Sequence, residues 1–164
     1  MVKRLYIVRH AQAEDGYLRD LERNLTSKGI MQSAKLGRSL KEEGISIGKI
    51  LSSPANRAFQ TAKVLLEQYN REEDEIVVLE GLYGGGPRGY LAAINGIAEE
   101  EDSAAVFGHN PDITFFAEYL TRDDIQGDMK KATIIVMEFE NLNWAEISGN
   151  TGKVLRRIDV GTIA

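Results

Sequence analysis

The chain has 164 residues, of which 43% are hydrophobic and 27% charged, and this composition is typical of a globular protein with a sizeable core. A length of this order fits one domain, so we expect residues 1–164 to fold as a unit. The formal net charge of −5 argues against nucleic-acid binding, because a phosphate backbone requires a basic face on its partner.

Two further features bear on the compartment. The chain has no cysteine, which excludes disulfide scaffolds, thiolate metal sites and cysteine catalysis. The first residues, MVKRLYIVRH, hold an apolar stretch that ends at Arg9 and is too short for a signal peptide or a membrane helix. We therefore expect a cytoplasmic protein that does not bind membranes.

Strand-like and helix-like segments alternate through the first 120 residues. In chain order they are a strand over 3–8, a helix over 27–43, a strand over 49–51, a helix over 55–69, a strand over 76–79, a helix over 88–99, a strand over 103–107 and a helix over 113–120. This order favours an α/β fold, a three-layer α/β/α sandwich with a mostly parallel central sheet. Beyond it, residues 132–140, 143–148 and 153–160 are predicted to form short strands that add a hairpin or an edge to the sheet.

Three of the predicted helices begin with residues that suit a helix cap. Thr26, Ser53 followed by Pro54, and Asn110 followed by Pro111 each stand just before a helical segment. A helix N-terminus offers unpaired N–H groups and the positive end of the helix dipole. An anion lying between such helix ends would be stabilised, and phosphate is the most natural candidate.

Polar side chains follow four predicted strands, at the point where each strand ends. The chain has two histidines, His10 and His109. Each lies two positions after the end of an apolar run, LYIV for His10 and AAVF for His109. Arg9 precedes His10, Arg57 lies in the helical turn after the second strand, and Glu80 follows the third strand. Because ligands collect at the carboxyl ends of the strands in an open α/β sheet, we expect these side chains to face one pocket.

The residue types in this set indicate an anion site. The guanidinium group of arginine is a planar, permanently charged fork that matches phosphate oxygens. The same arginines would repel a metal ion, and a zinc site would also need three or more ligands. We therefore expect that the protein binds neither a metal nor a cofactor. We also expect that its two histidines act on a phosphoryl group.

Four motifs together resemble the histidine phosphatase superfamily. They are Arg9-His10-Ala11, LTSKG at 25–29, SSPANRAFQTA at 52–62 and GHNP at 108–111. The compact length and the GHNP form are similar to the SixA-type phosphohistidine phosphatases within it. The resemblance implies a phosphoglycerate mutase-like fold, with His10 as the nucleophile that becomes transiently phosphorylated and Arg9, Arg57 and His109 completing the phosphate pocket.

Two positions qualify this resemblance. Ala11 stands where the family usually has glycine, which is the smallest possible change. Larger members of the family carry a carboxylic acid after the third strand that protonates an alcohol leaving group, and Glu80 is the candidate for this role; its alternative role is that of a plain surface residue at a strand end. A phosphohistidine substrate tolerates a missing acid, because a protonated imidazole leaves as a neutral amine.

These observations predict a metal-independent phosphatase that works through a covalent phosphohistidine intermediate. The segment between the third and fourth strands has no long insertion that could form a lid, so the expected substrate is phosphohistidine on a protein and the expected process protein dephosphorylation. Two alternatives remain open. One is a phosphatase or mutase for a small phosphorylated metabolite, and the other is a non-catalytic module that binds phosphate or a phosphoprotein.

Overall fold

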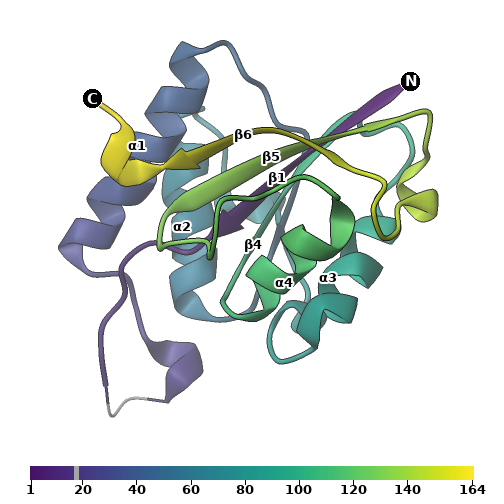
Figure 1. Ribbon diagram of the computed structural model, residues 1–164. Coiled ribbons are helices and arrows are strands. Elements are labelled where there is room, and N and C mark those ends of the chain that lie inside the picture. Colours follow the sequence, from purple (N-terminus) through teal and green to yellow (C-terminus); the bar gives the residue numbers. More distant parts are fainter. Residues whose placement is uncertain (17–18) are drawn as a thin grey trace.

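A six-stranded β-sheet runs through the middle of the molecule, with helices on both faces (Figure 1). The computed structural model describes residues 1–16 and 19–164. The strands lie in the order β3-β2-β4-β1-β5-β6. Their bounds are β1 Val2–Arg9, β2 Lys49–Ser52, β3 Ile76–Val78, β4 Ser103–Gly108, β5 Thr133–Glu140 and β6 Lys153–Asp159.

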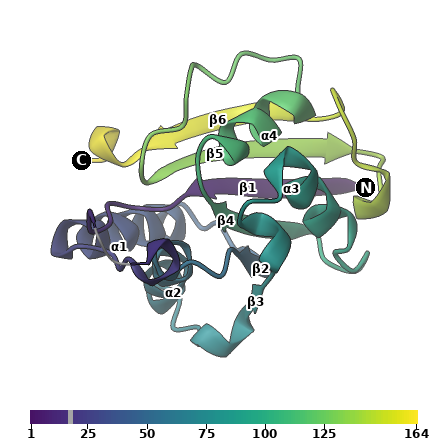
Figure 2. The same cartoon turned by 90° about the horizontal axis from the view of Figure 1, so that it is seen from below.

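The four strands from β3 to β1 are mutually parallel, as the alternating sequence predicts. β5 runs antiparallel to β1, and β6 runs antiparallel to β5, so the last two strands form the predicted hairpin at one edge of the sheet (Figure 2). The parallel arrangement places the carboxyl ends of β1, β2, β3 and β4 along the same edge. The first and fourth strands are neighbours in this sheet although they are far apart in the chain.

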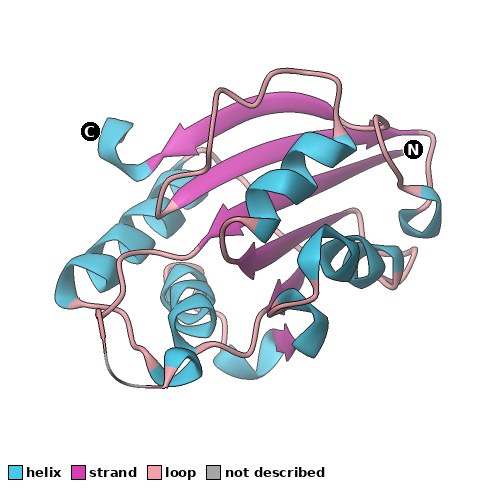
Figure 3. Cartoon of the chain, turned by 60° about the horizontal axis from the view of Figure 1, so that its bottom comes forward, coloured by secondary structure: helices cyan, strands magenta, loops and turns pink. Residues whose placement is uncertain are grey.

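Among the described residues, four α-helices form the outer layers of the sandwich. α1 (Ser27–Glu42) and α2 (Asn56–Glu67) share a buried apolar cluster with one face of the sheet, where Leu36 and Leu65 pack against Phe107 and Ile134. α3 (Gly86–Asn95) and α4 (Asp112–Leu120) cover the other face, and their cluster includes Ile94. Figure 3 shows helices in front of and behind the strands. The predicted three-layer architecture is confirmed.

The predicted strand over 143–148 is wrong. Residues Trp144–Glu146 instead form a short 3-10 helix. The Asn143 side chain and the Glu146 side chain cap this turn reciprocally, which satisfies the backbone groups locally. The Trp144 side chain is buried in the apolar cluster beneath α3. Local capping and burial of one large side chain therefore prevail over the strand-like composition of this segment.

The predicted helix caps have mixed outcomes. Thr26 caps α1 and accepts a hydrogen bond from the backbone N–H of Gly29 at 3.1 Å. Ser53 does not cap α2, whose N-cap is Ala55, and Asn110 does not cap α4, whose N-cap is Pro111. The Ser53 hydroxyl instead accepts from the Ala55 backbone N–H, just ahead of the helix, and contacts His109, while the Asn110 amide donates to the Met129 carbonyl. Among the residues that the structure describes, no helix is both long and apolar enough to span a bilayer.

Candidate active site

The two histidines meet at the carboxyl edge of the sheet. β1 ends at Arg9 and β4 at Gly108, and these two residues are register partners in the parallel ladder. His10 and His109 are the next residues along each strand, and the His10 backbone N–H donates to the Gly108 carbonyl at 3.1 Å. Their ring centroids lie 5.3 Å apart. The sheet register thus brings together two side chains that are separated by almost one hundred positions in the sequence.

His10 is held in a defined orientation and is only 5% exposed. Its Nδ1 lies 2.7 Å from the carbonyl oxygen of Ala11. Because a carbonyl can only accept, Nδ1 carries the proton in the neutral ring and Nε2 keeps its lone pair. Burial, above all, lowers the pKa of His10 to about 3, with smaller contributions in the same direction from His109 and from the two arginines of the site. At neutral pH the ring is therefore uncharged and its Nε2 is available as a nucleophile.

Ala11 fits the backbone at this position. Its side chain is fully buried, and its backbone N–H donates to the Thr61 hydroxyl at 3.1 Å. The Thr61 hydroxyl in turn donates to the Arg57 carbonyl at 2.7 Å. These bonds hold the backbone N–H of the same residue whose carbonyl accepts from His10, and the alanine at this position is compatible with that orientation of the histidine.

His109 is positioned from three sides. Its Nε2 lies 2.6 Å from the Ser53 hydroxyl, and its backbone N–H donates to the Tyr90 hydroxyl at 3.0 Å. The Tyr83 ring meets the imidazole edge to face, with centroids 5.7 Å apart. Burial, followed by the positive charge of Arg57, lowers the pKa of His109 to about 4. The second histidine is therefore also neutral at physiological pH in the free protein.

Both predicted arginines belong to the same cluster. Arg57 lies in the first turn of α2 and is 6% exposed, and the Arg9 side chain donates to the Met129 carbonyl at 3.0 Å. The positive charges of Arg9 and Arg57 each lower the pKa of both histidines, as expected for cations close to the two rings. Within the described part of the chain, the buried atoms Arg9 Nε and His109 Nδ1 have no hydrogen-bond partner.

A carboxylate that the sequence analysis did not single out binds this cluster. Asp20 stands at the start of a short 3-10 helix, Asp20–Glu22, and its Oδ2 accepts from Arg57 at 2.9 Å and from the Tyr83 hydroxyl at 2.6 Å. Its Oδ1 accepts from Arg23 at 3.1 Å. The bond from Tyr83 and those from the two arginines hold the pKa of Asp20 well below its usual range, and the bond to Asp20 raises the pKa of Tyr83.

Inspection of the residues at strand ends does not find three members of this cluster, Asp20, Arg23 and Tyr83. Asp20 and Arg23 lie between the first strand and the first long helix, in a charged stretch with no hydrophobic period. Tyr83 comes three residues after Glu80, beyond the end of the third strand. The only available hint was the density of charged residues ahead of the LTSKG motif.

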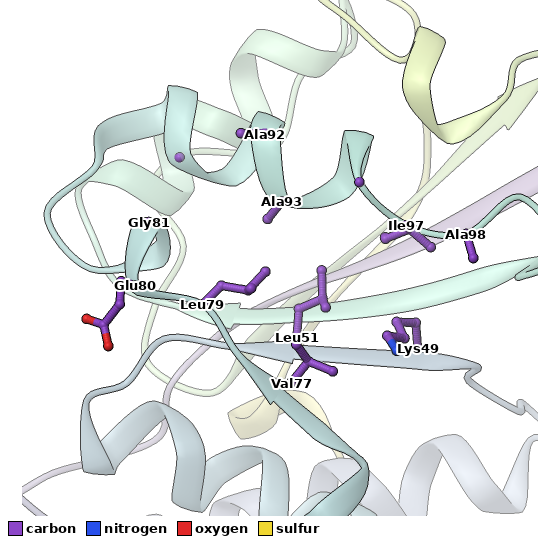
Figure 4. Close-up of a pocket in the computed structure, with 12 residues that line it drawn as sticks. Lys49, Leu51, Val77, Leu79, Glu80, Gly81, Ala92, Ala93, Ile97 and Ala98 are labelled. Atoms are coloured by element: carbon purple, nitrogen blue, oxygen red, sulfur yellow. The ribbon is translucent and has the colours of Figure 1, made fainter.

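Glu80 lies elsewhere on the same edge of the sheet. It is an exposed residue at the start of a 3-10 helix, Glu80–Leu82, at the end of an apolar cavity of about 500 Å³ between α3 and the strands β2 and β3. Figure 4 shows its carboxylate pointing away from the apolar side chains of that cavity, which include Leu79 and Ala93. Neither histidine lines this cavity, whereas the charge of Asp20 raises the pKa of His109 against the larger opposing effects of burial and Arg57.

The donor set does not match a metal centre. No group of three or more His, Cys, Asp or Glu side chains is arranged to hold a metal ion in the ranges 1–16 and 19–164. Two histidines flanked by two arginines instead lie together at the carboxyl edge of an α/β sandwich, and the arginines give this cluster positive charge that can attract an oxyanion. Such a set of side chains is chemically suited to binding a phosphoryl group.

Comparison with known proteins identifies the family. The family model described as histidine phosphatase superfamily (branch 1) matches residues 5–83. The chain is also 33% identical over 140 residues to an uncharacterized protein of Picosynechococcus sp., an alignment that covers 80% of this chain and 82% of that protein. The chain belongs to the histidine phosphatase superfamily and is a phosphatase of that superfamily. The predicted family is confirmed.

A curated relative and two solved structures extend this result. A broad-specificity phosphatase of Saccharomyces cerevisiae is 31% identical over 111 residues, and the match spans 64% of this chain but only 46% of the yeast protein. The structure of the protein histidine phosphatase SixA with tungstate aligns with a TM-score of 0.83 at 23% identity, covering 98% of this chain and 99% of that one. A phosphoglycerate mutase of Bacillus anthracis aligns with a TM-score of 0.75 at 16% identity, covering 99% and 95%. The predicted phosphoglycerate mutase-like fold is confirmed, and in its fold the chain is SixA-like.

Proposed function

We propose that this phosphatase removes phosphoryl groups through a covalent intermediate on His10, and that its substrate is phosphohistidine on a protein. The observation that carries the proposal is the bond between His10 Nδ1 and the Ala11 carbonyl. That bond, together with a pKa lowered to about 3, leaves an unprotonated Nε2 in a buried site beside three other cationic or proton-carrying groups. A neutral imidazole in this state can attack phosphorus in line.

The two half-reactions balance without an added base. In the first, the bond between His10 Nε2 and phosphorus forms while the bond from phosphorus to the substrate ring nitrogen breaks, and the substrate imidazole, protonated on its other nitrogen, leaves as a neutral ring. His10 then carries the phosphoryl group on Nε2 and keeps its proton on Nδ1. In the second, water attacks phosphorus, His10 leaves as a neutral imidazole, and the protons of the water remain with phosphate and solvent.

The other residues of the cluster are proposed to stabilise the transferring group. Arg9 and Arg57 would neutralise the equatorial oxygens as their charge spreads in the transition state. A bound dianion raises the pKa of a neighbouring imidazole, so His109 would take up a proton and act as a third donor. The buried and unpartnered Arg9 Nε is a group whose desolvation a phosphate oxygen would offset. No metal ion is needed in this scheme, because the arginines supply the positive charge.

The choice of a phosphohistidine substrate rests on the leaving group. An alkoxide leaves badly without a proton, whereas a protonated phosphoimidazole needs no further acid. Glu80, the candidate acid, is exposed and makes no hydrogen bond to either histidine, and a phosphohistidine substrate does not require it. The likeness in fold to a protein histidine phosphatase supports the same choice. Hydrolysis of small phosphate esters is the second candidate, and the phosphatase name of the yeast relative favours it.

The test compares a phosphohistidine peptide with para-nitrophenyl phosphate, both in EDTA, for the wild type and His10→Asn. Asparagine keeps an N–H donor for the Ala11 carbonyl but cannot form the intermediate. We expect turnover to be lost in the variant, an acid-labile phosphoryl label to be trapped on wild-type His10, and the peptide to be preferred over the ester. A preference for the ester that disappears in Glu80→Gln would favour the metabolite enzyme, and tight peptide binding without phosphate release would indicate a binding module.

A further inference from the structure

α1 concentrates positive charge in a protein that is acidic overall. Four of the 20 basic residues of the chain lie in this helix, against one of its 25 acidic residues, Glu42. The four are Lys28, Lys35, Arg38 and Lys41. In the part of the chain that the structure describes, none of them forms an ion pair with a carboxylate. Internal salt bridges therefore do not account for this charge.

Four residues of α1 form one continuous stripe. Lys28, Met31, Lys35 and Arg38 are spaced by three, four and three positions, which places them on the same side of a helix. The buried residues of α1, such as Leu36 and Leu40, lie on its opposite side against the sheet. We call these four residues the α1 stripe. At about 1.5 Å per residue it extends about 15 Å along the helix axis.

The α1 stripe borders a hollow with an apolar component. A surface depression of about 580 Å³ is lined by the α1 stripe, by Ile30 and by Val160 and Gly161 of the C-terminal turn that lies beside α1 in Figure 1. Met31 is 70% exposed and Ile30 is 48% exposed. Exposed apolar side chains between cations are typical of surfaces that bind another protein, and methionine adapts readily to different contacts.

The α1 stripe begins at the rim of the candidate active site. Gln12, two residues after His10, bonds to the N-terminal part of α1: its side chain accepts from the hydroxyl of the N-cap residue Thr26 at 2.8 Å, and its backbone N–H donates to the Gln32 side chain at 3.0 Å. A protein that presents a phosphorylated side chain to His10 would therefore extend along this helix.

We propose that the α1 stripe is the docking surface for an acidic segment of the phosphoprotein substrate. The proposal deepens the proposed function and rests on it, because only a macromolecular substrate reaches from the phosphoryl site onto α1. Complementary charge would raise the rate of encounter and fix the substrate's register, while the phosphoryl group supplies the chemistry.

The test uses two phosphohistidine peptides that differ in one block. One carries, next to the phosphohistidine, a run of about five Asp and Glu residues, which in an extended chain of about 3.3 Å per residue covers the about 15 Å length of the α1 stripe. The other carries Ser and Gly in the same block. For the wild type at low salt we expect the acidic peptide to have a kcat/KM about 5- to 10-fold higher, a preference that high salt removes.

The charge-reversal variant Lys35→Glu/Arg38→Glu should lose this preference while its turnover of para-nitrophenyl phosphate is unchanged. Arg122→Glu/Lys153→Glu is the matched control, because both of its positions are exposed, lie outside α1 and give the same change in net charge. Anisotropy of the labelled acidic peptide without its phosphoryl group tests docking separately from chemistry. Loss of all phosphohistidine turnover with intact anisotropy would refute the proposed function alone.

Three results would overturn the docking proposal. The first is equal kcat/KM for both peptides in the wild type together with no anisotropy change for the acidic peptide. The second is an equal loss of preference in the control variant, which would assign the effect to overall charge. The third is self-association through the α1 stripe, in which acidic residues 72–75 or 99–102 of a second copy occupy it; sedimentation of the wild type and of Lys35→Glu/Arg38→Glu would detect this.

Discussion

Replacing His10 by asparagine should make the protein more stable relative to the wild type at acidic pH than it is at neutral pH. In the folded protein the pKa of His10 is about 3, while in the unfolded chain it returns to 6.5. Between these two values the unfolded chain binds a proton that the folded protein refuses, so the free energy of unfolding of the wild type falls as pH falls from 6.5 toward 3. The variant lacks this group and escapes that loss.

The size of the effect follows from the two pKa values. At pH 5 the pH lies 1.5 units below the pKa of 6.5 in the unfolded chain. At about 1.4 kcal/mol per unit, the free energy of unfolding of the wild type is therefore about 2 kcal/mol lower than at neutral pH. At pH 8 both states are neutral at this ring and the contribution vanishes. The result at pH 5 depends little on the exact folded pKa, because any value well below 5 gives the same loss.

Urea unfolding of the wild type and His10→Asn at pH 8 and pH 5 measures this difference. The stability of the variant relative to the wild type should rise by about 2 kcal/mol between pH 8 and pH 5. Thr114→Val is the control, because Thr114 is buried and its side chain bonds only to the neutral groups Asn110 and the Met129 backbone, so its stability cost should be equal at both pH values. A relative stability of His10→Asn that does not change with pH would refute the claim that burial keeps His10 neutral.

Three further predictions concern the same edge of the sheet. Asp20→Asn removes the negative charge beside Arg57 but keeps an oxygen acceptor for it. Phosphate should then bind more tightly, so its inhibition constant should fall by about 3- to 10-fold. Weaker inhibition would mean that Asp20 acts by orienting Arg57. Gly108→Ala places a Cβ on the Tyr90 hydroxyl and should cost about 1–3 kcal/mol in urea unfolding, whereas Gly161→Ala, which meets nothing within 4 Å, should change stability by less than about 0.5 kcal/mol. Phosphatase activity should persist after dialysis against EDTA, and activity restored only by an added divalent ion would contradict the arginine-based mechanism.

Several parts of this protein could be predicted from local sequence. The alternation of apolar runs with helical periods predicted the parallel sheet, because each period reports directly which side chains are buried. The same reasoning placed His10 and His109 at strand ends. In an open parallel sheet those ends share one edge, so their meeting required no knowledge of side-chain contacts.

Other features required the tertiary structure. The pairing of Asp20 with Arg57 joins residues 37 positions apart, and neither periodicity nor a strand end marks Asp20. Ser53 suits a helix cap by its sequence context, yet in the folded protein its hydroxyl binds His109. Glu80 stands at a strand end like the histidines, but its carboxylate points to solvent.

The sequence by itself predicted the layers, the strand directions and the proximity of Arg9, His10, Arg57 and His109, because burial periodicity and strand polarity are local properties that the chain carries at each position. Only the tertiary structure decided which charges face those residues and what protonation state they hold. The depressed pKa values of the two histidines arise from burial and from the arginines gathered around them, and both depend on contacts between distant segments.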